Sequence, residues 1–273
     1  MEEEPLGSGA FGKVYNAKWR GRNVVVKVIE TANEKEKQAF GKESKITLSL
    51  DHSNVIKLFG ITHVKQNNQG IVMEKATQGS LDRWIGRIDF ANMIKIASGI
   101  VEGLMYVHSN NVIHRDLRPQ NILMFGSTTE DMIPKIADFG VSKVIDTAMT
   151  KHTGEVGTML YMAPEVKLCK EYGFTADIYS LATVLFEIFS EQPISDTSEE
   201  VRLRRKFPKK SKVPTYLCGI IERGWDEEVG KRPCLSKYNS VLRGSTFSLL
   251  LNIHCKSVLW CIVFYDKSGS NSL

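Results

Sequence analysis

The sequence has few cysteines, and their spacing lacks the pattern of a metal site or of a disulfide framework. The 273 residues contain five cysteines, an odd number scattered over positions 169, 218, 234, 255 and 261. The first residues, Met-Glu-Glu-Glu-Pro, also lack the basic and apolar segments of a secretory signal. These absences favour reduced thiols over disulfides. We therefore expect a cytoplasmic protein.

One apolar segment, residues 246–265, has the length of a membrane span but lacks its uninterrupted apolar character. Asn252, His254 and Lys256 fall at its centre. A lysine at the centre of a bilayer costs about 2.5–3.5 kcal/mol on insertion scales. We therefore expect no membrane association. Two interpretations of this end of the chain stay open, a tail that packs on the rest of the protein and a misassigned terminus.

A basic surface spread over the whole chain is also absent, although the formal net charge is +5. Residues 202–212 contain seven Lys and Arg side chains, so the rest of the chain has a balance of 5 − 7 = −2. Because the excess is local, we expect a solvated surface and no nucleic-acid partner. A docking patch for acidic substrates and a nuclear-localisation run are the alternatives.

Residues 112–123 form a polar loop between apolar ends, and they contain candidate catalytic and metal-binding side chains. Asp116 and Asn121 lie in this loop, and Asp138 follows two apolar runs, 122–125 and 133–137. These runs flank a Gly-Ser-Thr-Thr-Glu-Asp segment, a pattern typical of a hairpin with a long loop. The two ends of an antiparallel pair meet, so we expect Asn121 beside Asp138 and Asp116 nearby. Two oxygen ligands suit a magnesium ion carrying a polyphosphate, and a third carboxylate can accept a hydroxyl proton.

Glycines at positions 7, 9 and 12 form a second candidate site, which we interpret as a phosphate-binding turn. Glycine lets backbone amides approach phosphate oxygens, because no Cβ stands in the way. A dinucleotide-binding fold shares this glycine pattern but requires a helix directly after it. Here residues 14–19 and 24–29 are β-prone, and a turn at residues 20–23 separates them. The sequence therefore favours a hairpin over the phosphates.

Lys27 interrupts the apolar run 24–29, and Glu43 lies on the apolar face of a predicted helix over residues 31–50. A carboxylate on a buried face is costly unless it is paired, and Lys27 is the obvious partner. We therefore expect a Lys27–Glu43 ion pair. The alternatives are a strand lysine that reaches solvent and a simple surface glutamate.

Three motifs, in this order along the chain, resemble the signature set of eukaryotic protein kinases. They are His114-Arg115-Asp116-Leu117 with Asn121, then Asp138-Phe139-Gly140, then Ala163-Pro164-Glu165. The resemblance covers roughly residues 5–243, and it implies an α+β, two-lobed protein kinase fold. A small antiparallel β-sheet lobe with one key helix is expected beside a larger, mainly α-helical lobe. The implied kinase domain spans residues 1–243, with a small lobe at 1–73, a hinge at 74–79, a large lobe at 80–243 and an atypical tail at 244–273.

The resemblance also implies ATP, magnesium and a protein substrate, together with the residues that bind them. Asp116 is then the catalytic residue, assisted by Lys27, Arg118 and Asn121, while Asn121 and Asp138 hold magnesium. Met73 matches the gatekeeper position behind adenine. The implied nucleotide pocket comprises Leu6, Gly7, Ser8, Gly9, Gly12, Val14, Val25, Lys27, Met73, Glu74, Ala76 and Leu123.

Further matching positions imply structural roles. Arg232 pairs with Glu165 near the end of the fold. Asp177 ties a buried central helix, residues 176–189, to the backbone of the catalytic loop. A stacked hydrophobic column links the two lobes, and its members are Leu58, Thr47, Phe139 and His114. Thr47 departs from the family, which usually has a larger hydrophobic residue there.

Arg115 implies control by phosphorylation, since a guanidinium beside a catalytic carboxylate invites an anion from elsewhere in the chain. A phosphothreonine brings about −1.5 to −2 charge and acceptor oxygens for bidentate pairing. Thr153 is the first candidate and Thr150 the second, whereas Thr158 is expected to contact Asp116. An upstream kinase or trans-autophosphorylation would supply the phosphate.

The hydroxyl specificity follows from positions around the catalytic loop. Arg118 has a placement also seen in some tyrosine kinases, whereas Pro119 and Thr158 are typical of serine/threonine kinases. We expect a serine/threonine kinase, most like the tyrosine-kinase-like group because of Trp225 and the Met-Ala-Pro-Glu at 162–165. A tyrosine or dual-specificity kinase is one alternative. A pseudokinase scaffold, which keeps the fold without turnover, is another.

Overall fold

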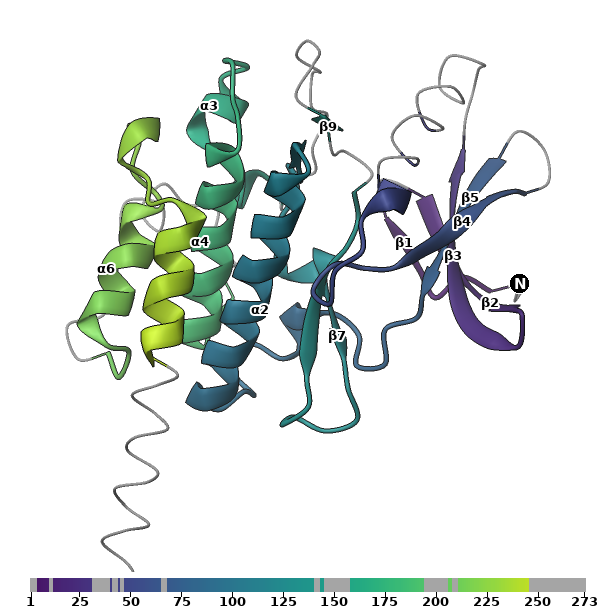
Figure 1. The fold of residues 1–273 in the computed structure, drawn as a ribbon, viewed down its shortest axis with the longest axis horizontal. Coiled ribbons are helices and arrows are strands. Elements are labelled where there is room, and N and C mark those ends of the chain that lie inside the picture. The colour runs from purple at the N-terminus through teal and green to yellow at the C-terminus, as the bar shows by residue number, and fades with distance from the viewer. Residues whose placement is uncertain are drawn as a thin grey trace, which may run out of the picture.

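A small antiparallel sheet stands beside a larger group of helices, with a β-hairpin between them (Figure 1). This computed structural model describes residues 4–9, 12–30, 40, 44, 47–64, 68–139, 143–144, 158–193, 206–207 and 211–245. The sheet uses residues before position 75, and the long helices follow position 89. The predicted division into a small sheet lobe and a larger helical lobe is confirmed.

The sheet contains five strands in the order β1-β2-β3-β5-β4, all antiparallel. The strands are β1 (Gly7–Gly9), β2 (Gly12–Trp19), β3 (Arg22–Glu30), β4 (Leu58–His63) and β5 (Asn68–Glu74). Gly12 begins β2 with a φ of +121°, and a Cβ there would lie 2.1 Å from the Val28 carbonyl oxygen. A strand therefore follows the glycines, as the sequence predicts, and the helix of a dinucleotide-binding fold does not.

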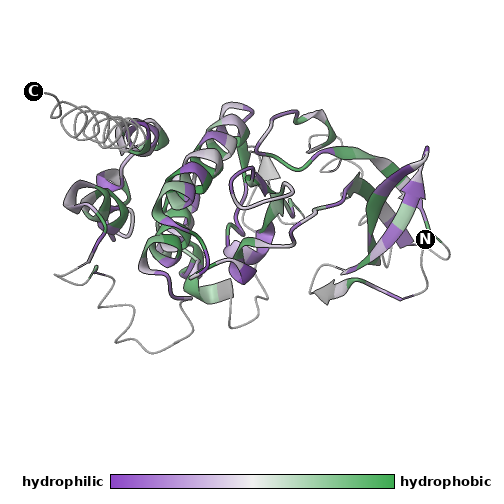
Figure 2. Cartoon of the chain, turned by 90° about the horizontal axis from the view of Figure 1, so that it is seen from below, coloured by the Kyte–Doolittle hydropathy of each residue, from purple (hydrophilic) through white to green (hydrophobic). Residues whose placement is uncertain are grey.

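The helical lobe is built around α2 (Phe90–Ser109) and α4 (Thr175–Ser190), which pack against each other. Asp89 caps α2, since its side chain accepts a hydrogen bond from the Asn92 N–H. Shorter elements complete the lobe: η1 (Leu81–Arg83), η3 (Thr158–Leu160), α3 (Pro164–Lys167), α6 (Thr215–Arg223), η4 (Val229–Lys231) and a helix over residues 235–245. The sheet strands and the central helices carry long hydrophobic stretches (Figure 2).

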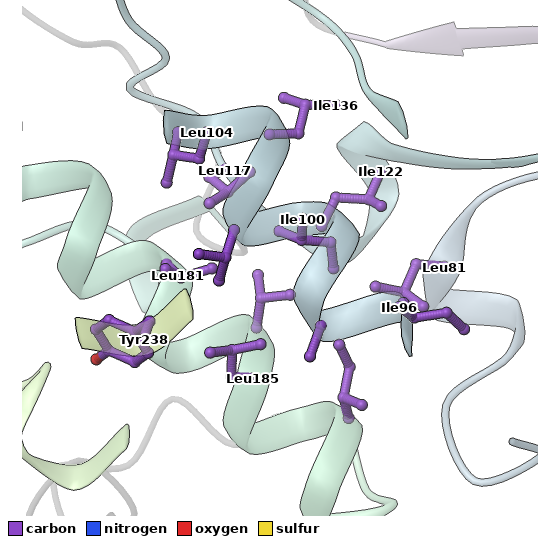
Figure 3. Packing of buried hydrophobic residues seen from close by; sticks show 14 of the residues in the cluster. Leu81, Ile96, Ile100, Leu104, Leu117, Ile122, Ile136, Leu181, Leu185 and Tyr238 are labelled. Atoms are coloured by element: carbon purple, nitrogen blue, oxygen red, sulfur yellow. The ribbon is translucent and has the colours of Figure 1, made fainter. Parts of the chain in front are cut away.

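A single hydrophobic core joins α2, α4 and the loop that contains Asp116. Figure 3 shows Ile100 and Leu104 of α2, Leu181 of α4 and Leu117 of the loop gathered in this core. Among the described residues, α2 is the one helix long and apolar enough to cross a membrane, and 56% of its most apolar 18-residue stretch is buried inside the protein. Burial on this scale identifies α2 as a core helix. The apolar segment 246–265 lies outside the described residues.

The hairpin consists of β7 (Ile122–Phe125) and β8 (Ile133–Ile136), with Ile122 paired to Ile136. This is the hairpin that the alternation of apolar runs predicts. It packs against α2 and so belongs to the helical lobe. Close by, β6 (Val112–Ile113) pairs with β9 (Lys143–Val144).

The loop before β4 fixes the small sheet to the helical lobe. Asn54 donates a hydrogen bond to the Pro134 carbonyl oxygen at 2.9 Å, and its own carbonyl accepts one from Ile136. Gly99 and Gly103 of α2 face Asn54 so closely that a Cβ would lie 2.7 and 2.6 Å from its nearest atoms. This close approach needs glycine, and it ties the sheet connection to the hairpin.

Candidate active site

The loop between β6 and β7 presents one buried carboxylate whose geometry suits proton acceptance. The Asn121 side chain donates through Nδ2 to both the carbonyl oxygen and Oδ2 of Asp116, each at 2.7 Å. Asp116 Oδ1 is buried and has no hydrogen-bond partner within the described part of the chain. Burial raises the pKa of the Asp116 carboxyl, and the charges of Arg118 and His114 offset this rise only in part. Oδ1 is therefore the atom positioned to receive a hydrogen from a hydroxyl group.

Asn121 and Asp138 lie at the two ends of the β7–β8 hairpin, as the sequence predicts. The Ala137 N–H donates to the Asn121 carbonyl oxygen at 2.8 Å, so these ends are joined by a hydrogen bond. Lys27, buried in β3 of the small sheet, places its Nζ 2.5 Å from Asp138 Oδ1. The site therefore brings together side chains from the sheet, the loop and the hairpin.

Asp177 of α4 holds the loop in this shape. Its two carboxylate oxygens accept the backbone N–H groups of His114 and Arg115, both at 2.8 Å, and His108 Nε2 lies 2.8 Å from Oδ2. Burial alone would raise the pKa of the Asp177 carboxyl. The hydrogen bond and charge of His108, together with the backbone hydrogen bond from Arg115, outweigh burial and hold this pKa below its usual range. Arg115 has a φ of +72°, a costly conformation for a residue with a side chain. The fixed carboxylate supports this backbone.

Members of the predicted hydrophobic column are buried, and two of them touch. The rings of His114 and Phe139 meet edge to face with centroids 5.0 Å apart, and His114 Nε2 lies 2.9 Å from the Ala137 carbonyl oxygen. Leu58 and Thr47 are buried as well. The His114–Phe139 contact places the residue after Asp138 against the loop that contains Asp116.

The predicted Arg232–Glu165 ion pair is present and buried. The Arg232 Nη1 and Nη2 atoms donate to the two Glu165 oxygens at 2.6 and 2.8 Å. Burial raises the pKa of Glu165, but the hydrogen bonds from Arg232 outweigh it and hold this pKa below its usual value. The pair joins α3, which contains Glu165, to Arg232 near the end of the helical lobe.

The residues expected around adenine lie where the sheet meets the hairpin. Val25 of β3 and Leu58 of β4 both pair with Met73 of β5, so all three lie at one level of the sheet. Leu123 lies in β7 of the hairpin. Glu74 ends β5, and in the described part of the chain the Ala76 N–H makes no hydrogen bond with the protein.

The remaining glycine-turn residues lie on the first two strands. Leu6 is exposed just before β1, its N–H donating to the Val14 carbonyl oxygen at 2.7 Å. Gly7 pairs with Val14, and Gly9 pairs with Gly12 across the β1–β2 hairpin. Ser8 also lies in β1. The turn expected to cover the phosphates is therefore a strand–turn–strand unit.

Several predictions concern residues outside the described part of the chain. They are the partner role of Glu43, the phosphorylation of Thr150 and Thr153, and the arrangement of Gly140, of most of 202–212 and of the tail. Thr158 begins η3, but the structure describes nothing of its side chain. These stay predictions.

Three contacts at the site were not expected from the sequence. Glu74 binds Lys135 through its side chain, whereas the sequence indicated only a place for Glu74 in the nucleotide pocket. Tyr161 and the buried Glu187 of α4 lie within hydrogen-bond distance, at 3.0 Å. His108 contacts Asp177. Lone charged residues within apolar runs, such as Glu187 and Lys135, were the available signal, because a buried charge requires a partner.

The oxygen atoms at the hairpin ends fit a magnesium ion. The Asn121 Nδ2 donates to Asp116, and the Asn121 Oδ1 accepts no hydrogen bond from the described residues. Asp138 directly follows Ala137, whose N–H donates to the Asn121 carbonyl oxygen, so the Asn121 amide and the Asp138 carboxylate offer two oxygen ligands of the kind that Mg²⁺ prefers at the meeting ends of the hairpin. No cluster of three or more His, Cys, Asp or Glu side chains occurs among the residues the structure describes. Such a two-ligand site suits an ion whose other ligands come from water and phosphate.

Comparisons with known proteins agree with this geometry. The sequence model of the protein kinase domain matches residues 1–240. The chain is 31% identical over 246 residues to serine/threonine-protein kinase STY17 of Arabidopsis thaliana, covering 85% of this chain and 42% of the relative. It is 32% identical over 272 residues to dual specificity protein kinase shkE of Dictyostelium discoideum, covering 91% of this chain and 37% of the relative.

A third relative is similar over a smaller share of its own length. RGS domain-containing serine/threonine-protein kinase A of Dictyostelium discoideum is 30% identical over 262 residues, which cover 90% of this chain and 22% of the relative. The chain thus spans well under half the length of these three relatives. The family match nevertheless extends over most of the chain, and the sheet, hairpin and helical lobe have the arrangement expected of it. The chain belongs to the protein kinase family.

Proposed function

We propose that this protein transfers the γ-phosphoryl group of ATP to serine and threonine hydroxyls of protein substrates, as part of a signalling process. The observation that carries the proposal is the buried Asp116 Oδ1, which has no partner among the described residues. It lies in the same loop as Asn121, which is joined to the hairpin end that carries Asp138. In this proposal Asp116 is the proton acceptor and Asn121 and Asp138 are the metal ligands, on a loop and a hairpin end that a hydrogen bond joins.

Different residues of the site have different roles in phosphoryl transfer. Lys27 binds phosphate oxygens from the sheet side, since its Nζ already lies against the Asp138 carboxylate. Asp116 Oδ1 orients the substrate hydroxyl and takes its proton. The hydroxyl oxygen bonds to the γ-phosphorus as the bond between that phosphorus and the ADP oxygen breaks. Arg118, whose charge acts on Asp116, adds positive charge near the transferred group. Magnesium, when held by Asn121 and Asp138, supplies neutralisation of phosphate charge. Positioning and charge neutralisation are what phosphoryl transfer requires.

The serine/threonine assignment rests on sequence positions and on relatives. Pro119 and Thr158 are typical of serine/threonine kinases, and two of the relatives are named serine/threonine kinases. The motif at 162–165 and Trp225 favour the tyrosine-kinase-like group. The relative shkE is named a dual-specificity kinase, so phosphotyrosine among the products is the outcome that would revise the assignment.

We also propose that phosphorylation regulates the enzyme. The Arg115 guanidinium stacks over the Tyr172 ring, with 5.4 Å between the Arg115 Cζ and the ring centroid. A guanidinium can bind two oxygens of a phosphate through paired hydrogen bonds, so Arg115 carries the charge and the donors that a phosphothreonine would pair with. Thr153, then Thr150, are the proposed phosphorylated residues, modified by an upstream kinase or by another copy of this chain.

Incubation of the purified chain with magnesium, labelled ATP and a general protein substrate tests the function. Asp116→Asn should lower transfer by about 10²–10⁴-fold, the usual contribution of a positioned acid or base. Asp138→Asn should abolish the magnesium-dependent reaction. Asp51→Asn, a change at an exposed aspartate outside the site, is the matched control and should leave activity unchanged. Phosphoamino-acid analysis of the product should give phosphoserine and phosphothreonine.

A contrary result has a defined meaning. If the wild-type chain binds nucleotide but its labelling does not exceed that of Asp116→Asn, the protein is a pseudokinase and the enzymatic proposal is wrong. If a well-folded Asp138→Asn protein keeps full turnover, the magnesium assignment is wrong.

A further inference from the structure

The hinge after β5 is joined at both of its ends to the β7–β8 hairpin. The Thr77 hydroxyl donates to the Gly126 carbonyl oxygen at 2.8 Å and accepts from the Gly126 N–H at 3.0 Å. The Gln78 N–H donates to the Met124 carbonyl oxygen, and the Met124 N–H donates to Gly79. These bonds hold the last part of the hinge on β7 and on the turn that follows it.

Glu74 fastens the first part of the hinge through its side chain. Its Oε1 accepts the Lys57 N–H at 2.7 Å, and its own N–H donates to the Lys57 carbonyl oxygen at 3.0 Å. Both carboxylate oxygens also accept from Lys135 Nζ of β8, at 2.7 and 2.8 Å. One carboxylate therefore joins β5, the loop before β4 and the hairpin.

Lys135 occupies a defined place within the hairpin. It pairs with Leu123 across the two strands, and paired residues of an antiparallel ladder project to the same face. Its Nζ lies 4.6 Å from the centroid of the Phe125 ring, a cation–π distance. The ammonium is thus held between an aromatic ring and a carboxylate, on the face that carries the proposed adenine contact Leu123.

The Glu74–Lys135 pair is better enclosed than an ordinary surface ion pair. The side chains are 20% and 17% exposed, whereas the Lys57–Asp51 pair nearby is 39% and 77% exposed. Exposed pairs contribute little because solvent screens the charges and both side chains lose freedom. Here Lys135 is already fixed by the Phe125 ring and Glu74 by the Lys57 N–H, so little additional ordering of the two side chains is needed to form the pair.

We infer that Lys135 is a positioning residue, whose ion pair with Glu74 orders the adenine-binding hinge on the β7–β8 hairpin. The hairpin that anchors the hinge also carries Asn121 and Asp138 at its ends, so one element connects the hinge to the proposed metal ligands. The inference rests on the proposed function only in requiring that the site binds magnesium and an adenine nucleotide. Lys135 itself touches none of the reacting atoms.

Removal of this ion pair should weaken nucleotide binding more than chemistry. Without Lys135 the start of the hinge is less ordered, and binding must then restrict it at a cost in affinity. We expect Lys135→Met to raise the Kd for magnesium–ADP about five- to twentyfold, a range that matches coupling between contacting residues. The KM for ATP should rise similarly, while kcat stays within about threefold. Lys135→Arg keeps the charge and should bind within about threefold of wild type.

Isothermal titration of the full chain with magnesium–ADP, and with adenosine, tests the inference. Wild type, Lys135→Met, Glu74→Gln and the double variant form a cycle, in which the double variant should bind no more weakly than either single variant. Adenosine should lose affinity by the same factor as ADP, because the hinge contacts adenine. Lys95→Met is the matched control, since Lys95 contacts the Glu130 carbonyl in the loop of the same hairpin. Its affinity should equal that of wild type.

The possible outcomes separate this inference from the proposed function. If wild type binds nucleotide and Lys135→Met binds equally well, or if the two single losses add in the double variant, Lys135 has no positioning role. A loss confined to magnesium–ADP, with adenosine unaffected, would also overturn the inference, because adenosine reports on the hinge alone. If wild-type protein binds neither ligand, the proposed function fails, and the inference fails with it.

Discussion

Replacement of Arg232 by methionine should destabilise the fold strongly, because it leaves a buried carboxylate without its cation. The Arg232 side chain is fully buried and donates to both Glu165 oxygens, to the Thr175 carbonyl at 2.9 Å and to the Asp226 carbonyl at 2.9 Å. Loss of one partner of a buried ion pair costs about 3–5 kcal/mol. For a chain of this size each kcal/mol lowers Tm by roughly 2–4 °C, so the expected decrease is roughly 6–20 °C.

Urea denaturation followed by circular dichroism measures this loss, and a pH series tests its cause. The pKa of Glu165 is held below its ordinary value of 4.5 in the folded protein, so its ionised form stabilises the fold above that pH. This contribution is lost as the pH falls through the lowered pKa of the folded state. In Arg232→Met, burial without the cation favours the protonated acid, so lowering the pH stabilises this variant relative to wild type.

The difference in unfolding free energy between wild type and Arg232→Met should therefore be full at pH 7. It should narrow as the pH falls towards 4.5, and it should narrow further below pH 4.5 as Glu165 of the wild type is protonated. Arg232→Met combined with Glu165→Gln removes the charge and should recover part of the loss. A decrease below about 1 kcal/mol at pH 7, the range of exposed pairs, would refute the reasoning. So would a difference that stays constant as Glu165 is protonated.

Three further changes have outcomes set by the geometry. Gly103→Ala should lower the free energy of unfolding by about 1–3 kcal/mol, because the new Cβ would lie 2.6 Å from the Asn54 carbonyl oxygen. Gly219→Ala should raise the free energy of unfolding by up to about 1 kcal/mol, because Gly219 lies in α6 and a Cβ there would have no atom within 4 Å. Equal effects of the two changes in thermal melts would contradict this. Asp177→Asn should cost about 1–3 kcal/mol and at least tenfold in transfer rate. The N–H groups of His114 and Arg115 donate to different Asp177 oxygens, and in the variant an amide NH2, which cannot accept, replaces one of these oxygens. Wild-type rates would show that another group holds the loop. Met73→Gly should admit adenine analogues bulky at the exocyclic amine; equal inhibition of both proteins by such analogues would show that Met73 does not gate the pocket.

Local patterns in the sequence were sufficient to predict the hairpin and the meeting of its ends. Alternating apolar runs around a polar segment place β7 and β8 within one residue of the observed bounds. Antiparallel geometry then requires Asn121 and Asp138 to be neighbours, whatever the rest of the chain does. The glycine turn was predictable for the same reason, since β-prone residues follow it directly.

Contacts that depend on the relative placement of distant elements could not be predicted in the same way. Nothing local to residue 74 or residue 135 reveals that β5 ends beside β8, because this depends on how the sheet is seated on the helical lobe. The position of the sheet on the helical lobe is fixed by Asn54, which packs against Gly99 and Gly103 of α2. Tertiary packing, and not strand propensity, decides which charged side chains meet there.

The same distinction explains which charged residues in apolar runs were interpreted correctly. Asp177 and Arg232 matched motif positions, so resemblance supplied their partners. Glu74 matched the hinge, but the resemblance supplied no side-chain partner for it, and Lys135 matched no motif position. In the sequence each looks like an ordinary surface charge. Their burial shows otherwise, since two partly enclosed charges that meet at 2.7 Å must each have displaced water. The physical requirement that a desolvated charge finds a partner is therefore the general rule, and in this chain it links the hinge to the hairpin that presents Asn121 and Asp138.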